Sequence, residues 1–464
     1  EERPSKRVRS DVDIDPLMTA VVPAPSSFSD PKVWKGHQSE SPLLLNHRPS
    51  TANGVPIMLS HPIFSKFQEL YNNCEVNQEE CDFVLNLTSV MSDPFKDEDN
   101  RRDKFVEIVE QYFLRTCDRT FFGKTHTDEC ITMRKGLLRI PLAILEVKPE
   151  LGIGSGCPYV QATAYYGRYI VGGLSEAHKN DHEQLRYSSC CPAFLIYLTG
   201  PYVGIAGAVY SGRASFDPLS PVIPLLFLNH YPESMLLAAR VFRALKICLS
   251  ELETYYENLK FISKNDNIPQ QAAFPYIQEF DFNDVTIHFS YLKRIANKLT
   301  YVVEVSNEYE SVTKGKLLVK FTRQYGLETH QYCSNNGIAP KLFGCQNIPG
   351  GWKMVIMEYL DGYSRLCDLD RQMKEEVQMS VMEAVQVMHS ENYVHGDLKS
   401  VNIIISEGNV KLLDFDWSGK EGMITYPHFI NRISIKSWHS EVCAGALIRK
   451  THDLHSLDHI FKNE

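Results

Sequence analysis

Two acidic residues and an amide stand at fixed spacing near the C-terminal end of the chain, in YVHGDLKSVNIIISEGNVKLLDFDWSG (393–419). Asn402 follows Asp397 by five positions, and Asp414 comes after an apolar run. A carboxylate can accept the proton of an attacking hydroxyl, and carboxylate and amide oxygens are the ligands that Mg²⁺ prefers. Lys399 would lie near a transferred phosphate. This set predicts phosphoryl transfer from a metal–nucleotide, with Asp397 as the base and with Asn402 and Asp414 as metal ligands.

The segment resembles the protein kinase catalytic loop (H-x-D-L-K-x-x-N) followed by the metal-binding D-F-G segment. The resemblance implies ATP and Mg²⁺ as cofactors and a protein substrate that carries the accepting hydroxyl. Asp416 stands where the kinase pattern has glycine. Asp453, in THDLHSLDHI, resembles the kinase aspartate that hydrogen-bonds the backbone of the catalytic loop.

The preceding region resembles the smaller, strand-rich lobe of a kinase. Lys320, in KLLVKF, stands on the third expected strand, where the ATP-binding lysine belongs. Glu328 follows eight residues later on a short expected helix and is the best candidate for its ion-pair partner. A solvent-facing role for Glu328 is the alternative.

The run MVIMEYLDG (354–362) resembles the kinase hinge strand. Backbone groups from Glu358 to Leu360 would hydrogen-bond adenine. The Gly-rich loop that normally cradles the phosphates is missing between the first two expected strands. Lys298 is a candidate to supply a point charge in its place.

A second group of polar residues lies in the N-terminal half. Glu146 and Lys148 share one face of an expected strand, LAILEVKPE, because side chains alternate along a strand. Asp128 stands beside an earlier expected strand. Gln161 and Tyr165 lie one turn apart on an expected helix.

Together these residues resemble the PD-(D/E)XK nuclease core. The resemblance implies that Asp128 and Glu146 bind Mg²⁺ and that Lys148 orients or deprotonates the attacking water. Gln161 and Tyr165 would help to orient DNA or the metal site. The first acidic residue of the family would be Glu107 or Glu110, on the preceding helix. A turn or cap role for Asp128 and a solvated strand edge for Glu-x-Lys are the alternatives.

Composition narrows the class of protein. The chain has 464 residues, is 43% hydrophobic and 23% charged, and carries a formal net charge of −9, which excludes a polycation that binds nucleic acid with its whole surface. Its twelve cysteines include no C-x-x-C pair, which favours a reduced compartment, the cytoplasm or nucleus. The charge-free run at 192–212 contains Gly-Pro and many β-branched residues, so we expect a buried β-hairpin and no stable membrane insertion.

We expect an α+β or α/β multidomain protein. Residues 1–50 are Pro- and Ser-rich and should be disordered or weakly ordered, with a small basic cluster that is either a nuclear-import signal or a solvated tail. Residues 51–260 should form the nuclease-like α/β core with flanking helices. Residues 261–464 should form a minimal two-lobed protein-kinase-like domain, with an N-lobe at about 281–362 and a short C-lobe at 363–464.

The order of the segments resembles that of a Crinkler-family effector. The segments are HPIFSKF, ILEVKPE, CCPAFLIYLTGPYV, LETYYENL, HGDLKSVN and LLDFDWSG. The resemblance implies a protein secreted by a fungus or oomycete that acts in the host cell, often in the nucleus. The family's N-terminal delivery module is not found in this chain, although LMTAVVP (17–23) resembles the end of its recruitment motif.

Three functions remain open on the sequence. The first is a Mg-ATP-dependent Ser/Thr-type protein kinase fused to a nuclease-like domain. The second is a small-molecule phosphotransferase of the aminoglycoside- or choline-kinase type, which the HGD and DFD triplets also fit; Lys399 argues against it. The third is a pseudokinase scaffold whose other half binds or cuts DNA, which Asp416 and the missing Gly-rich loop favour.

Overall fold

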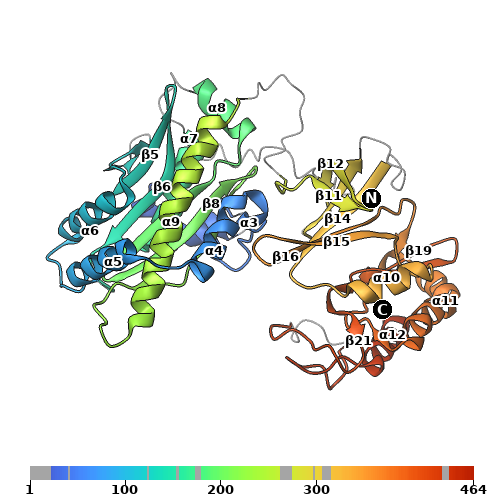
Figure 1. The fold of residues 1–464 in the computed structure, drawn as a ribbon. Helices are drawn as coiled ribbons and strands as arrows, with labels where there is room; N and C mark the ends of the chain where they lie inside the picture. Colours follow the sequence, from blue (N-terminus) through green and yellow to red (C-terminus); the bar gives the residue numbers. More distant parts are fainter. Residues whose placement is uncertain are drawn as a thin grey trace. The chain divides into compact units, whose positions relative to one another are not determined.

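The structure, a computed structural model, divides the chain into two compact units: Glu1–Ile277, here unit 1, and Gln278–Glu464, here unit 2 (Figure 1). We expected the kinase-like domain to begin at residue 261. The basic cluster at 3–9 and most of LMTAVVP lie outside the described residues. The described residues are 22–39, 42–122, 125–152, 156–172, 179–261, 274–295, 298–305, 315–430 and 438–463.

A mixed sheet of eight strands forms the centre of unit 1 among its described residues, in the order β1-β9-β8-β7-β6-β5-β2, with β10 paired to β8. A separate short pair, β3-β4, lies outside this sheet. The strands are β1 (Leu44–Leu45), β2 (Cys117–Asp118), β3 (Phe121–Phe122), β4 (Thr125–His126), β5 (Glu129–Lys135), β6 (Leu138–Lys148), β7 (Ala193–Thr199), β8 (Tyr202–Tyr210), β9 (Ala214–Pro218) and β10 (Ile223–Pro224).

Strand β6 lies inside this sheet and is buried along nearly its whole length, as its continuous apolar run predicts. It pairs antiparallel with β5 and parallel with β7. A parallel pair needs a crossover connection, and α7 (Pro158–Gly172) and α8 (Lys179–Ser188) lie in the chain between the two strands. The expected hairpin at 192–212 is confirmed, because β7 and β8 pair antiparallel across a turn at Gly200, whose φ is +54°.

The helical regions expected on either side of the sheet strands are also present. Helix α9 (Pro232–Asn258) runs across the sheet in Figure 1 and packs against α4 and α5. Its buried residues recur every three or four positions, which gives the helix one apolar face. Between β1 and β2 in the chain lie the helices α3 (Ile57–Ser60), α4 (Pro62–Asn73), α5 (Gln78–Met91) and α6 (Glu98–Phe113).

The N-terminal segment is more ordered than its composition indicated. We expected disorder or weak order over residues 1–50, and for the described residues from 22 onward this was wrong. Phe28 and Leu44 are fully buried in the main hydrophobic core of unit 1, and Asp30 caps the second helix. A few apolar side chains buried in the core outweigh a polar average composition. The elements here are α1 (Pro25–Phe28), α2 (Pro31–Gln38) and β1.

Unit 2 begins with an antiparallel sheet of six strands in the order β11-β12-β13-β14-β16-β15, which matches the expected N-lobe. Helix α10 (Leu327–Asn335) follows β14 directly in the chain. The strands are β11 (Glu279–Phe282), β12 (Val285–Arg294), β13 (Thr300–Val305), β14 (Gly315–Thr322), β15 (Leu342–Ile348) and β16 (Trp352–Glu358).

The rest of unit 2 packs around α11 (Arg371–Ser390). Val381, Val385 and Met388 on this helix form a core with Leu412 and Phe415. Leu398 of the catalytic-loop sequence and Ile403 of the strand that follows it belong to the same core. The remaining elements are β17 (Ser364–Arg365), β18 (Tyr393–Val394), β19 (Ile403–Ser406), β20 (Asn409–Leu412), β21 (Gly419–Lys420), the 3₁₀ turns η5 (Leu366–Asp368), η6 (Ser400–Asn402) and η7 (Phe415–Trp417), and α12 (Lys450–Asn463).

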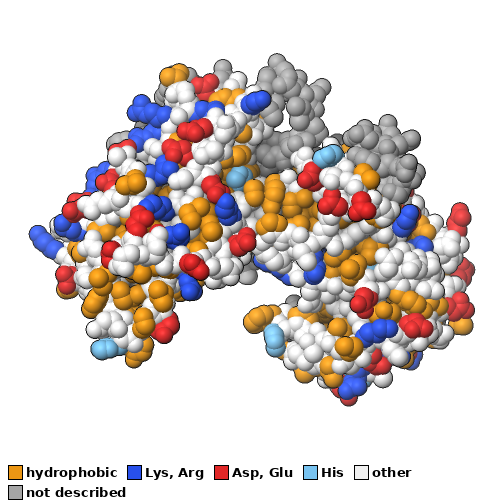
Figure 2. All heavy atoms as spheres, viewed as in Figure 1, with side chains coloured by type: hydrophobic (Ala, Val, Ile, Leu, Met, Phe, Trp, Pro, Cys, Tyr) orange, Lys and Arg blue, Asp and Glu red, His pale blue; other side chains and the backbone are white. Residues whose placement is uncertain are grey.

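Three general expectations can be compared with the structure. Within the described residues, no helix combines the length and apolar character needed to cross a membrane. All twelve cysteines are free thiols. Acidic and basic side chains are interspersed on the face of the molecule seen in Figure 2.

Candidate active site

The catalytic-loop sequence is held in place by Asp453 at the start of α12. Its two carboxylate oxygens accept hydrogen bonds from the backbone N–H groups of His395 (2.8 Å) and Gly396 (2.9 Å), and His389 Nε2 lies 3.0 Å from Oδ2. Asp453 is almost fully buried, so these bonds fix the loop backbone in a water-poor environment. Gly396 has φ +80°, and a Cβ there would lie 2.9 Å from a side-chain carbon of Ile448, so the turn requires glycine.

Asp397, Lys399 and Asn402 lie together in this loop. Asn402 Nδ2 donates to the backbone oxygen of Asp397 (3.0 Å) and to its carboxylate (3.3 Å), which leaves the amide oxygen of Asn402 as the atom available to a cation. Lys399 Nζ lies 2.5 Å from Asp397 Oδ1. Burial raises the pKa of Asp397, and the Lys399 charge only partly offsets this effect. A carboxylate with a raised pKa is a better proton acceptor.

The second motif places two carboxylates around one lysine. Lys320 Nζ, on β14, lies 2.5 Å from Asp414 Oδ1 and 2.5 Å from Asp416 Oδ1. Burial works against the charged form of Asp414, but the Lys320 ammonium outweighs it and lowers the pKa of Asp414 to about 2. Burial raises the pKa of Asp416, and the neighbouring Asp414 adds to that shift while Lys320 opposes it. Lys298 lies farther out, 3.5 Å from Asp414 Oδ2.

The expected partner of Lys320 is corrected by this geometry. Glu328, in the first turn of α10, is exposed, and the ion pairs of Lys320 within the described residues go to Asp414 and Asp416 instead. The buried residues of α10 are Thr329, His330 and Cys333, none of them acidic. Helix α10 therefore turns its only carboxylate away from the lysine.

The hinge segment leaves β16 as expected. The backbone N–H of Glu358 donates to Lys341 O (2.9 Å), and the Glu358 carboxylate accepts from the Lys341 N–H (3.1 Å). These bonds fix the end of β16. They also use the Glu358 N–H, so the groups left for adenine in this segment are the Glu358 carbonyl and the backbone that continues to Leu360.

Two tryptophans beside Lys399 were not anticipated from the sequence. The rings of Trp417 and Trp438 are stacked with centroids 6.0 Å apart, and Lys399 Nζ lies 5.8 and 5.4 Å from them. A cation near such ring faces is held in place by the ring quadrupole. Trp417 follows DFD directly, so only its position could have suggested a role; Trp438 is far away in the sequence.

The donor set fits a magnesium nucleotide. The Asn402 amide oxygen and the Asp414 carboxylate are hard oxygen ligands, the class that Mg²⁺ prefers. Lys320 supplies positive charge beside Asp414, and Lys399 supplies it beside Asp397. Charged donors of this kind make strong hydrogen bonds to phosphate oxygens.

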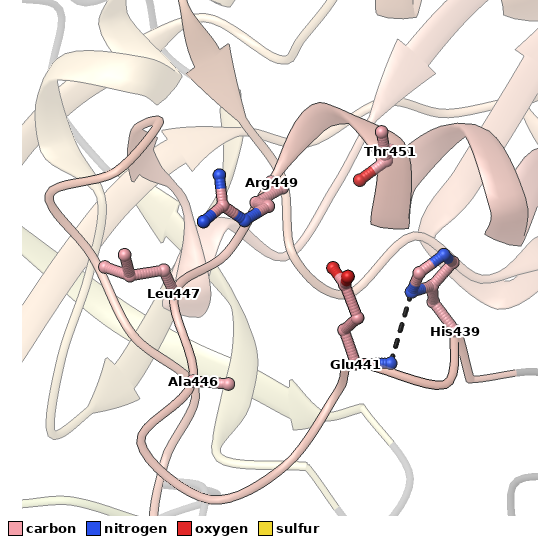
Figure 3. Close-up of a pocket in the computed structure, with 6 residues that line it drawn as sticks. All are labelled: His439, Glu441, Ala446, Leu447, Arg449 and Thr451. Carbon is pink, nitrogen blue, oxygen red and sulfur yellow. Dashed lines mark hydrogen bonds between the residues drawn. The ribbon is translucent and has the colours of Figure 1, made fainter.

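A pocket beside the loop before α12 holds a second cluster (Figure 3). It is lined by His439, Glu441, Ala446, Leu447, Arg449 and Thr451, and His452 completes a group with His439 and Glu441. His439 Nδ1 accepts from the Glu441 N–H at 3.2 Å, and His452 Nδ1 accepts from the Arg449 N–H at 3.4 Å. Each neutral ring therefore carries its proton on Nε2, and His452 Nε2 lies 3.4 Å from the Glu441 carboxylate as a donor. This cluster anchors the loop onto α12.

Unit 1 brings most of the second predicted site together. Lys148 Nζ lies 3.1 Å from Glu146 Oε1 and 3.2 Å from Glu98 Oε1. Burial, with a contribution from the nearby Asp128 charge, raises the pKa of Glu146 to about 8. Glu146 Oε2 is buried and has no hydrogen-bond partner within the described residues. Asp128 is anchored beside it, because its Oδ2 accepts from the Val147 N–H at 2.8 Å.

The helix residues of this second site are only partly as expected. Tyr165 lies close enough for the Glu146 charge to raise its pKa further, after burial as the main cause. Gln161 is buried and donates to Ser29 Oγ (3.2 Å), in a segment that we expected to be disordered.

The prediction that Glu107 or Glu110 supplies the acidic residue from the preceding helix was wrong. Glu107 forms an exposed ion pair with Lys104, and Glu110 accepts from the Cys117 N–H. Glu98, at the start of α6, is the residue that contacts Lys148. The sequence carries no local signal for this choice, because three glutamates of α6 are equally plausible by spacing.

Comparison with known proteins points to the same part of unit 2. Residues 350–429 match the protein kinase domain family. The C-terminal part of the chain therefore carries a protein kinase domain, in an otherwise mixed α/β protein. The matched residues include Asp397, Asn402 and Asp414, but neither Lys320 nor Asp453.

Two relatives are Ser/Thr protein kinases of Schizosaccharomyces pombe. Serine/threonine-protein kinase mph1 is 57% identical over 35 residues, which are 8% of this chain and 5% of the relative. Serine/threonine-protein kinase sid1 is 30% identical over 90 residues, 18% of this chain and 19% of the relative. The chain thus spans less than a fifth of the length of either kinase.

A solved structure, that of the Cydia pomonella granulovirus kinase PK-1, is 20% identical and has a TM-score of 0.30. The alignment covers 38% of this chain and 69% of the viral kinase. A TM-score at this level does not establish a common fold.

Proposed function

We propose that unit 2 transfers the terminal phosphoryl group of Mg-ATP to a serine or threonine hydroxyl of a protein substrate. The observation that carries this proposal is the loop held by Asp453, because it holds Asp397 and Asn402 together. The N–H of Leu413, the residue before Asp414, donates to the Asn402 carbonyl (2.8 Å) and ties the second motif to this loop. The match of residues 350–429 to the protein kinase family supports the reaction class.

Each residue of the site has a separate role in the proposed phosphoryl transfer. Asp397, with its raised pKa, accepts the proton of the attacking hydroxyl. Lys399 is held between Asp397 and the tryptophan pair, where its charge can face the transferred phosphate. Lys320 supplies positive charge to the nucleotide phosphates, while Asn402 and Asp414 hold the metal. Bound Mg²⁺ would shield the negative charge of the phosphates.

The test is phosphate incorporation from radiolabelled Mg-ATP into the full chain and into a generic basic protein. Asp397→Asn should abolish incorporation, whereas the same change at the exposed Asp458 on α12, Asp458→Asn, should not. Equal incorporation by wild type and Asp397→Asn would overturn the proposal. Thermal-shift titration with Mg-ATP separates a working nucleotide site from a relic; a pseudokinase would show no transfer, whether or not it binds nucleotide.

The alternative function, a small-molecule phosphotransferase, differs from a protein kinase in the substrate that accepts the phosphoryl group. Lys399 contacts both the base and two tryptophans, and this arrangement favours a protein acceptor. ADP release should rise with Ser/Thr-containing proteins and stay at the basal rate with a panel of aminoglycosides and amino alcohols. Stimulation by the small molecules alone would transfer the proposal to that class.

A second candidate function concerns unit 1. The cluster of Asp128, Glu146 and Lys148, with an unpartnered buried oxygen on Glu146, supports metal-dependent hydrolysis of a phosphodiester of the PD-(D/E)XK type. Asp128 and Glu146 would hold the metal, and Lys148 would orient the attacking water. Gln161 and Tyr165 would position DNA.

Plasmid DNA incubated with the full chain and Mg²⁺ or Mn²⁺ tests this candidate. Glu146→Ala should abolish cleavage, while Glu107→Ala, an exposed glutamate that pairs only with Lys104 among the described residues, serves as the matched control. Cleavage that is equal in wild type and Glu146→Ala would remove the nuclease proposal and leave the kinase proposal intact.

We further propose a Crinkler-type role, in which the protein is secreted and then acts in the host cytoplasm or nucleus. The order of sequence segments supports the role, and the free thiols of all twelve cysteines fit a reduced compartment. A fluorescent fusion expressed in host cells should accumulate in the cytoplasm or nucleus. Retention in the secretory pathway would contradict this location.

A further inference from the structure

The ion pairs of Lys320 differ from those that the kinase pattern predicts. A lysine that contacts nucleotide phosphates needs a carboxylate to hold it in position, and the kinase pattern takes that carboxylate from the following helix. Here the helix α10 offers no buried acid, and its Glu328 is exposed. The lysine is nevertheless well held, with its side chain 13% exposed and its ammonium 2.5 Å from two carboxylates.

The two carboxylates that contact Lys320 differ in their expected role toward the metal. Asp414 is the expected metal ligand, and its oxygens are required by the metal once a nucleotide is bound. A lysine that depended on Asp414 alone would lose its partner at that moment. Asp416 is not an expected metal ligand, so its contact with Lys320 does not compete with the metal.

The local structure explains how Asp416 reaches the lysine. Asp414 has a left-handed backbone with φ +70°, and Phe415–Trp417 form the 3₁₀ turn η7. Phe415 is buried and stacks on His330 of α10, with ring centroids 4.6 Å apart, which anchors the turn. The turn thereby brings side chains two positions apart onto one ammonium group.

Strand β14 supplies two side chains that contact Asp416. Lys320 and Thr322 are two residues apart and so point to the same face of the strand. The Thr322 hydroxyl lies 3.1 Å from Asp416 Oδ2, while Lys320 binds Oδ1. Both carboxylate oxygens of Asp416 therefore contact side chains of the same strand.

We propose that Asp416, at the position where the kinase pattern has glycine, is the positioning residue for Lys320 and takes the place of the helix glutamate. The proposal rests on the phosphoryl-transfer function proposed above. It links two departures from the kinase pattern, the acidic residue after Asp-Phe and the exposed glutamate of α10, because the first supplies the carboxylate that the second does not.

A double-mutant cycle on Mg-ATP binding tests this role in the full chain. Asp416→Asn should weaken binding about tenfold, and it should cause no further loss in the Lys320→Met background, because its effect passes through the lysine. Asp416→Glu should restore part of the affinity, and Glu328→Gln should bind as the wild type does. Additive losses in the double variant, or a loss in Glu328→Gln equal to that in Asp416→Asn, would overturn the proposal.

The Mg²⁺ requirement separates positioning from metal binding. If Asp416 acts on Lys320, Asp416→Asn should leave the Mg²⁺ concentration for half-maximal nucleotide binding unchanged, whereas Asp414→Asn should raise it. A rise of similar size in both variants would make Asp416 a metal ligand and overturn the positioning role.

Melting without nucleotide makes the result independent of the proposed function. Asp416→Asn should lower the melting temperature of unit 2 in the wild-type background and have little effect in the Lys320→Met background. This coupling is expected even if the chain binds no ATP, so loss of the kinase proposal and loss of the ion-pair proposal give different results. If Asp416→Asn fails to fold, the same coupling can be measured with Thr322→Val, a milder change that removes the hydroxyl in contact with Asp416.

Discussion

Each unit of the molecule holds a lysine between two carboxylates, and the two arrangements behave in opposite ways. In unit 2, Lys320 lies between Asp414 and Asp416; in unit 1, Lys148 lies between Glu146 and Glu98. The pKa of Asp414 falls to about 2, whereas the pKa of Glu146 rises to about 8. At neutral pH the first carboxyl is charged and the second is largely protonated.

Burial and distance account for the difference. Asp414 has 24% of its side chain exposed and an ammonium at 2.5 Å, so the attraction outweighs the loss of hydration. Glu146 is 4% exposed, its lysine is at 3.1 Å, and Asp128 adds a second negative charge nearby. A lysine partner alone therefore does not keep a buried carboxyl ionised. At neutral pH Asp414 is therefore ionised without a bound cation, whereas Glu146 stays mostly protonated until a cation or a higher pH favours its charged form.

The largest expected effect tests whether the two sites are independent. Asp397→Asn should reduce phosphoryl transfer by about 10²–10⁴-fold, the usual contribution of a general base, and leave any DNA cleavage unchanged. Lys148→Met should do the reverse. The measurement is both activities on both variants; a variant that lost both would mean that the sites share one function.

The second effect concerns the raised pKa of Glu146. Because the folded pKa is about 8 and the unfolded value is near 4.5, the folded state binds the additional proton, and this stabilisation is lost as pH rises between the two values. The unfolding free energy of wild type relative to Glu146→Gln should fall by about 1.4 kcal/mol per pH unit in that window. Hydrogen exchange of the β6 amides in urea measures it, and a flat difference would contradict the buried, protonated carboxyl.

Asp414 should behave in the opposite sense. Its folded pKa of about 2 lies below the unfolded value of 3.8, so its stabilisation is fully present above pH 3.8 and is lost as pH falls through 2. Asp414→Asn should therefore cost about 2 kcal/mol, with no slope between pH 5 and pH 9. Exchange of the β14 amides provides the measurement. A pH slope like that of the Glu146→Gln difference would remove the contrast between the two sites.

The smallest effects belong to the outer charges of each site. Lys298 is 54% exposed and Glu98 is 36% exposed, so water and salt screen both. Lys298→Ala and Glu98→Gln should each change stability by less than about 1 kcal/mol, and the change should shrink further at high salt. For Lys298, a loss of nucleotide binding that persists at high salt would show that it replaces the missing Gly-rich loop after all.

The sequence by itself determined the parts of this protein whose geometry is local. Asp397 and Asn402 lie within one loop, and Gly396 before them provides the turn that this loop requires, so spacing alone predicts their proximity. The apolar run at 192–212 likewise contains its own turn residue and predicted a buried hairpin. The flanking helices expected for residues 51–260 are local in the same sense, because the buried residues of α9 recur every three or four positions.

Only the tertiary structure decided which charges meet and which segments are buried. Lys320 and Asp416 are 96 residues apart, and Lys148 and Glu98 are 50 apart, so no spacing rule distinguishes them from Glu328 or Glu110. The order of the segment from residue 22 onward likewise depends on a core to which it contributes only a few side chains, such as Phe28. Ion pairs and burial are set by the packing of distant elements, and a linear pattern does not record that packing.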